Sequence, residues 1–264
     1  MQKTFSPQGW LLAALITAGL WIGYANEPSR SAGNLKTSDT KAKQFFVAAK
    51  EAKAKSVKLG ALPASAKHIP EGATVIISAN IGELLEKGGY AEFLKSDIFQ
   101  DLRGIIENET AQKIMENPAA SGIDIYQPVY IYVNMSEPAE EFGDPLISGG
   151  LIAPVKDQKA LDKALDLATA QTGLPVNKTA EKGFTQLFMQ GMPAAVGYSK
   201  DVMIAVGTND PEKLPNITKS LADRMKGKAG LKNKRITTLL RNKYDMAAWM
   251  DYEKFMKFAQ GMVP

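Results

Sequence analysis

The 264-residue sequence contains no cysteine, and this absence removes several kinds of chemistry at once. Disulfides, thiolate metal sites, cysteine nucleophiles and the lipidated cysteine of a bacterial lipoprotein are all excluded. The redox compartment stays open, because a domain of this size can fold without disulfide bonds.

Histidine is almost as scarce, since His68 is the only one in the chain. A serine-histidine-acid triad would have to use it, and a zinc site would find a single imidazole. His68 precedes Ile69-Pro70 and a predicted first strand. A lone histidine in such an entry loop is usually solvated or a cap, so we expect it to be at least partly exposed. We also expect no serine or paired carboxylate beside it, and no catalytic role.

Strong charge of one sign is absent too. The net charge is +4, with 45% hydrophobic and 23% charged residues. This composition is typical of a folded protein with a core, and the small positive excess identifies no partner.

The first 25 residues carry an apolar run. Lys3 precedes the uninterrupted apolar stretch 9–25, and a polar run begins at Asn26. A charged start, an apolar middle and small residues at the end are typical of a secretory signal, with cleavage after Ala25. The stretch is also near the lower limit for spanning a bilayer, about 17 residues. A signal peptide is favoured, while a membrane anchor with membrane association through residues 9–25 and a buried core helix stay open.

Residues 26–61 are predicted as a polar linker followed by a basic helix rich in alanine and lysine, from Ser38 to Lys58. Basic amphipathic helices can lie on anionic membranes. A solvated stalk and a lipid-contacting helix are therefore both open, and the first is favoured.

Residues 62–264 are predicted as a single α+β domain. Alternating or β-branched runs predict strands at 73–79, 127–135, 146–155, 184–190, 194–198, 202–206 and 245–250. Asn80 and Asp251 stand where helix caps are expected, and a further helix is predicted to begin near Asp157. Hairpin-length links favour a mainly antiparallel mixed sheet, and single apolar stripes favour helices on one face. The chain starts in the β-α-β-β-α-β order of a split βαβ unit. Trp249 is expected to be mostly buried, holding the last strand to the sheet.

Four segments carry a family resemblance: HIPEGATVIISANIGELLEKGG, SGIDIYQPVYIYVN, GGLIAPVKDQKAL and DMAAWMDYEKF. In order and spacing they resemble the bacterial exported proteins catalogued as domain of unknown function 4836, over roughly residues 66 to 260. Members of that family are usually longer, so the chain resembles about the first half of one. The resemblance implies export and a shared fold, and it implies no catalytic residue.

Several patterns approach a functional motif without completing one. The acidic residues between 137 and 144 match no calcium loop, so a solvated loop is expected. Residues 197–201 lack the second glycine of a nucleophile elbow. Gly149 and Gly150 are expected to permit a bulge or close packing. A solvated face is also expected for the basic run Lys226, Lys228, Lys232, Lys234, Arg235, Arg241 and Lys243.

The sequence therefore names no catalytic, cofactor-binding or metal-binding residue and implies no cofactor. It favours an exported or membrane-anchored cell-envelope protein that is a non-catalytic binding or interaction module, not an enzyme. The expected partner is an envelope protein, a glycan or an anionic lipid, and export makes nucleic acid an unsuitable partner. The alternative is a carboxylate-dependent glycan hydrolase, since such enzymes need neither histidine nor cysteine.

Overall fold

The computed structural model describes residues 60–136, 146–227 and 230–261. The predicted signal or anchor, the basic helix Ser38–Lys58 and the acidic loop at 137–144 lie outside these residues. Within the described part, no helix is both long and apolar enough to cross a membrane.

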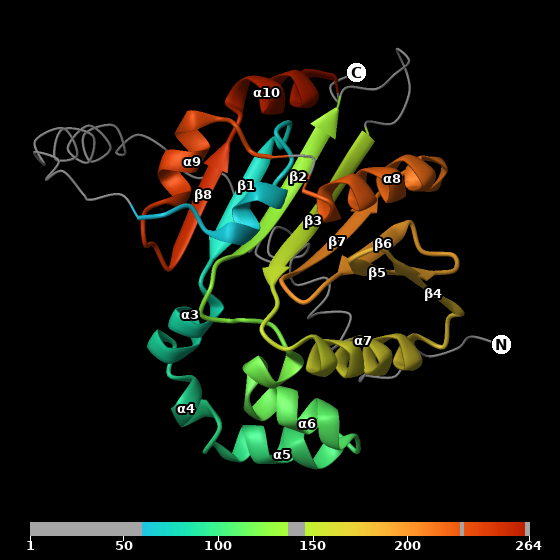
Figure 1. The fold of residues 1–264 in the computed structure, drawn as a ribbon. Coiled ribbons are helices and arrows are strands. Elements are labelled where there is room, and N and C mark those ends of the chain that lie inside the picture. Colours follow the sequence, from blue (N-terminus) through green and yellow to red (C-terminus); the bar gives the residue numbers. More distant parts are fainter. Residues whose placement is uncertain (1–59, 137–145, 228–229, 262–264) are drawn as a thin grey trace, which may run out of the picture.

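Eight antiparallel strands form one continuous sheet, which confirms the predicted α+β class with a mainly antiparallel sheet (Figure 1). The strand order across the sheet is β4-β5-β6-β7-β3-β2-β1-β8. The strands are β1 (Val75–Ala79), β2 (Val129–Ser136), β3 (Leu146–Pro154), β4 (Val176–Glu181), β5 (Phe184–Met189), β6 (Ala194–Tyr198), β7 (Val202–Thr208) and β8 (Met246–Met250).

The helices are distributed between the strands along the chain. The α-helices of the described residues are α3 (Ile81–Lys87), α4 (Tyr90–Phe93), α5 (Asp97–Ile105), α6 (Glu109–Glu116), α7 (Gln158–Thr172), α8 (Leu214–Met225), α9 (Lys234–Leu240) and α10 (Tyr252–Gly261). The same part of the chain contains the short 3-10 helices η1 (Ala64–His68), η2 (Pro118–Ser121) and η3 (Pro211–Lys213). In Figure 1, α4 to α6 form a group beyond one end of the sheet, next to α7.

The helices cover both faces of the sheet, so the expectation of one covered face is wrong. Leu221 of α8 packs in a cluster with Ile152 and Ile204, whereas Leu161 of α7 packs with Ala153 and Met203. Successive residues of β3 and β7 are therefore apolar, and each strand presents apolar side chains to both faces of the sheet. Because side chains alternate across a strand, such a run exposes apolar surface on both faces unless both are covered.

The predicted split βαβ pairing is also wrong, although the elements follow in the predicted order. No strand lies between β1 and β2, which pair directly and antiparallel, with Ile76 opposite Tyr132. The four helices between them lead the chain away from the sheet and back, and this leaves room for β2 to turn antiparallel beside β1.

The predicted caps are confirmed. The side chain of Asn80 accepts a hydrogen bond from the amide of Glu83 at 3.3 Å. Asp157, where only the start of a helix was predicted, is a cap as well and accepts from the amides of Lys159 and Ala160 at the start of α7. Asp251 accepts from the amide of Lys254 at 3.2 Å, at the start of α10. Each cap satisfies amides that the first helical turn leaves free.

The two outermost strands differ from expectation in different ways. β8 joins the sheet beside β1 as predicted, and Trp249 packs on the core, although it is partly rather than mostly buried. β4 was not predicted, because its sequence VNKTAE is polar and almost entirely exposed. Lysine and glutamate are typical of an edge strand, where they discourage pairing with other chains.

Candidate functional site

His68 is buried, so the expectation that it is exposed is wrong. The residue is 4% exposed at the end of η1, and its Nδ1 lies 2.8 Å from the carbonyl oxygen of Arg224. A ring nitrogen facing a carbonyl acts as a donor, which assigns the proton of the neutral ring to Nδ1. The backbone after η1 turns into the first strand here, and α8 covers the imidazole, which the local sequence did not indicate.

The contact between His68 and Arg224 lies at the base of a polar hollow between the sheet and α8. Asn134 of β2, Ser148 of β3 and Thr208 of β7 are paired in register, so their side chains form one row on the face that α8 covers. The amide of Asn134 lies 3.4 Å from the hydroxyl of Ser148. This row places polar groups directly beyond the apolar core of that face.

Helix α8 supplies the opposite wall. Asn216, Ser220 and Arg224 are four residues apart, which places them on one side of the helix. Asn216 and Ser220 are exposed at the rim, while Arg224 is 3% exposed at the base. The hollow has a volume of about 260 Å³, and Lys213 is a second cation at its edge.

The guanidinium group of Arg224 is held from two sides. Its Nε donates to the carbonyl oxygen of His68 at 2.9 Å, and one terminal nitrogen donates to the hydroxyl of Tyr132. The Arg224 Cζ also lies 4.6 Å from the centre of the Tyr132 ring. These contacts fix the plane and direction of the guanidinium group before any ligand arrives.

The other terminal nitrogen of Arg224, Nη2, is buried and has no hydrogen-bond partner among the described residues. The Oδ1 of Asn134 is likewise buried without a partner. Among the residues that the structure describes, no aspartate or glutamate lines the hollow. A buried cation without an acid partner carries an electrostatic penalty, and an anion bound beside it would remove that penalty.

Burial decides the ionisation of the groups around Arg224. Burial raises the pKa of Tyr132, and the nearby Arg224 charge opposes this rise only in part. Burial also lowers the pKa of His68, against the raising effect of its bond to the Arg224 carbonyl. Both side chains are therefore uncharged at neutral pH, and Arg224 is the cation at the base of the hollow.

Glycine at 150 permits this arrangement. A Cβ atom there would lie 2.3 Å from the carbonyl oxygen of Ala205 and 2.6 Å from the hydroxyl of Tyr132. The expectation that Gly149 and Gly150 allow close packing is thus confirmed, and the ring of Tyr132 occupies the space beside Gly150.

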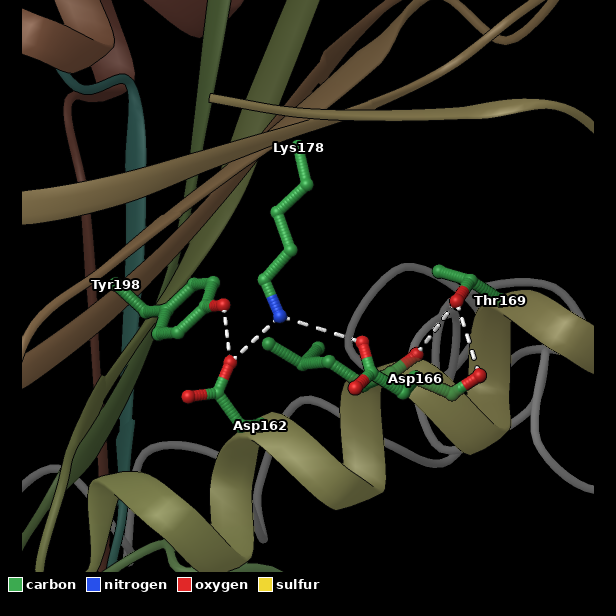
Figure 2. A network of polar contacts seen from close by, with 6 residues as sticks. Asp162, Asp166, Thr169, Lys178 and Tyr198 are labelled. Carbon is green, nitrogen blue, oxygen red and sulfur yellow. Dashed lines mark hydrogen bonds and ion pairs between the residues drawn. The ribbon is translucent and has the colours of Figure 1, made fainter. Parts of the chain in front are cut away.

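A second polar cluster lies on the other face, between α7 and the strands β4 and β6. Figure 2 shows Lys178 of β4 reaching Asp162 and Asp166 of α7, with Nζ to Oδ1 distances of 2.7 and 3.3 Å. Tyr198 donates its hydroxyl to Asp162 as well. Burial alone would raise the pKa of Asp162, but the bonds from Lys178 and Tyr198 outweigh it and lower the pKa.

These contacts give the second cluster a structural role, because they attach the edge strand β4 to α7. An open hollow of about 800 Å³ beside it is bordered by Asp157 and Asp162. Asp157 caps α7, and Asp162 has a lowered pKa, whereas the acid of a glycosidase needs a raised one. This cluster therefore does not supply the acid of the hydrolase alternative.

The remaining sequence candidates are dispersed. Residues 197–201 form the β6–β7 hairpin, as expected, and not a strand-to-helix elbow. The described members of the basic run are exposed. In the parts of the chain that the structure covers, no group of three or more metal-binding side chains comes together.

Sequence reasoning missed Arg224, Asn134 and Ser148 as a site. A signal was present, because Asn134 follows Tyr130 and Tyr132 on one face of its strand, and Asn216, Ser220 and Arg224 follow a helical spacing. Neither pattern indicates that the two rows face each other. That information appears only when α8 is placed on the sheet.

The fold and the site together define an α+β protein with a buried arginine at the base of a polar pocket. The chain belongs to the family described as domain of unknown function (DUF4836), whose model matches residues 66–262. This match confirms the resemblance found in the four sequence segments. No curated protein and no solved structure matches the chain significantly.

Proposed function

We propose that this protein is an exported or membrane-anchored cell-envelope protein whose folded domain is a non-catalytic binding module. The apolar run at residues 9–25 supports the location, because its flanks have the layout of a secretory signal or anchor. The arginine pocket supports the binding role, because it offers a fixed cation and polar side chains.

The observation that carries the proposal is the buried Nη2 of Arg224, for which the described part of the chain offers no acceptor and no carboxylate in the hollow. Its ligand is an anionic group, and a guanidinium fork suits a carboxylate or a phosphate. The rim favours a hydroxylated ligand, since Ser148, Thr208 and Ser220 offer hydroxyl groups. Of the partners considered, an acidic glycan unit fits this chemistry best.

The size of the pocket agrees with a small ligand. At about 260 Å³ it lies just below the usual range for drug-sized ligands, about 300 to 1,000 Å³, and is suited to one sugar ring. The bound carboxylate would lie against Arg224, and the ring hydroxyls would lie among the rim residues. The exposed Lys213 would attract the anion and would stay in contact with water when the ligand is bound.

Calorimetric titration of the full chain with glucuronate tests the proposal, with neutral glucose and inorganic phosphate as comparison ligands. We expect glucuronate to bind and glucose not to bind. Arg224→Gln should weaken glucuronate roughly 10- to 100-fold, the worth of a charged hydrogen bond. Phosphate binding without glucuronate binding would retain the anion site and reject the acidic sugar.

The matched control is Arg241→Gln, which removes the same charge from an exposed position outside the pocket. Its affinity for glucuronate should equal that of the natural chain. Asn216→Ala provides a second test at the exposed rim, where a loss of folding is not expected. Equal affinity in all the variants would contradict the proposal.

A further inference from the structure

A second hollow lies on the opposite face of the sheet, enclosed by α6, α7 and the strands β3, β6 and β7. Its volume is about 350 Å³. Helix α7 lies along one side, and α6 with Tyr90 and Ile106 lies along another. We propose that this hollow binds a single linear alkyl chain, such as the acyl chain of a fatty acid or of a one-chain lipid.

The chemistry of the lining restricts the ligand. Of the described residues that line the hollow, none is charged, and Tyr90 is the one with a polar side chain. The hydroxyl of Tyr90 already donates a hydrogen bond to the carbonyl oxygen of Met115, so it does not require an acceptor from a ligand. A bound group therefore has to be apolar where it is buried, since the lining leaves a polar group without partners.

Small side chains on α7 create the space. Leu161 and Leu165 fill the contact with the sheet, whereas Ala164 and Ala168 alternate with them on the same side of the helix and leave a gap. Ala205 of β7 is small as well. Protein interiors contain few voids larger than a water molecule, and apolar cavities stay dry and accept apolar molecules.

The size and the open side of the hollow favour one chain. Ligand sites range from about 300 to 1,000 Å³, and this hollow is at the lower end. Two acyl chains would not fit in this volume. Because the hollow is open on one side, the polar end of an amphiphile can stay in water while its tail is buried.

The arginine pocket does not account for this site. Side chains at even positions of β3 and β7, such as Ile152 and Ile204, point to the arginine face, while Leu151 and Ala205 point to the alkyl hollow. The two hollows are therefore separated by the sheet. Binding of an uncharged chain does not need Arg224, and its failure would leave the proposed anion binding unaffected.

The test uses the full chain and 1-decanol, which carries no charge for Arg224 to attract. Decanoate, as the free-acid form, and monodecanoylglycerol, as the lipid form, are then tested in the same way. Calorimetry at several temperatures should show saturable binding of one decanol per chain with a negative heat-capacity change, the mark of apolar burial. Ala168→Leu places a larger side chain in the hollow. It should weaken decanol binding at least tenfold and raise the melting temperature without ligand.

The matched control is Ala170→Leu, an exposed position on the same helix. Both variants contain the apolar segment 9–25, so any decanol that this segment binds is the same in each. Ala170→Leu should leave both decanol affinity and melting temperature unchanged. If Ala168→Leu does not fold, Ala164→Leu takes its place. Absence of saturable decanol binding would overturn the proposal, as would a folded filled variant that binds decanol as tightly as the natural chain.

Discussion

The arginine pocket and the alkyl hollow lie on opposite faces of the same sheet, and β3 and β7 contribute to both. On one face, the polar side chains of Asn134, Ser148 and Thr208 lie next to the apolar core. The buried Arg224 of α8 lies opposite them. On the other face the lining is uncharged, and alanines leave space under α7.

This difference shows that one strand can build two unlike sites, because successive side chains point to opposite faces. The arginine pocket is shaped by hydrogen bonds that fix Arg224 in one direction. The alkyl hollow is shaped only by the sizes of its side chains. Variants that disturb one face and spare the other would sharpen the comparison.

The largest effect is expected for Gly150→Ala. The added Cβ would clash with the carbonyl oxygen of Ala205 and with Tyr132, which holds Arg224. We expect a loss of roughly 3 to 5 kcal/mol in the free energy of unfolding, measured with denaturant. Gly104→Ala is the control, because its Cβ would meet no atom within 4 Å. A Gly150→Ala protein as stable as the control would contradict the close packing on the arginine face.

Leu165→Ala should affect the other face alone. Leu165 is 8% exposed and lines the alkyl hollow, so its truncation enlarges an existing space. The expected cost is about 2 to 4 kcal/mol, from lost burial and the larger cavity. Denaturant unfolding checks this, and glucuronate affinity should stay unchanged. A parallel loss of glucuronate binding would show that the faces are coupled.

Between pH 8 and pH 5, the arginine face should make stability depend on pH through His68. Because burial lowers the pKa of His68, the unfolded chain binds its proton more readily than the folded chain. This contribution is complete above the ordinary pKa of 6.5 and is lost as the pH falls from there to the lowered value. Unfolding measured between pH 8 and pH 5 should show declining stability.

His68→Asn is the matched variant, since an amide nitrogen can still donate to the Arg224 carbonyl but does not titrate. Its stability should decline less over the same pH range. Identical pH profiles for the two proteins would mean that the pKa of His68 is not lowered in the folded chain.

The smallest effect is expected for Lys178→Met on the α7 face. The side chain of Lys178 is 38% exposed, so water screens its ion pairs with Asp162 and Asp166. Such pairs contribute about 0 to 1 kcal/mol. Denaturant unfolding should therefore show a change of less than about 1 kcal/mol. A larger loss would mean that Lys178 supports this face as strongly as Arg224 supports the other.

Much of the fold could be predicted locally. The strands around Ile76, Tyr132 and Ile204 follow from β-branched and alternating runs, and Asn80 and Asp251 cap the helices they were expected to cap. The polar strand β4 was missed, because an exposed edge strand has no buried face to impose an apolar pattern. The single apolar stripes of the helices also did not indicate that the helices cover both faces of the sheet.

The site was less predictable than the fold. His68 was noticed for its scarcity and assigned the wrong environment, because burial depends on what packs over a residue. Its partner Arg224 is 156 residues away in the chain. No local spacing indicates that a carbonyl of α8 would meet an imidazole of η1.

The sequence by itself determined the class of the fold, the family and the lack of thiol chemistry, since each depends on residue type or local pattern. Only the tertiary structure decided which polar residues meet and which alanines leave a gap. Desolvation and packing arise between segments distant in sequence, so the unpaired guanidinium nitrogen and the alkyl hollow exist only once α7 and α8 lie against opposite faces of the sheet.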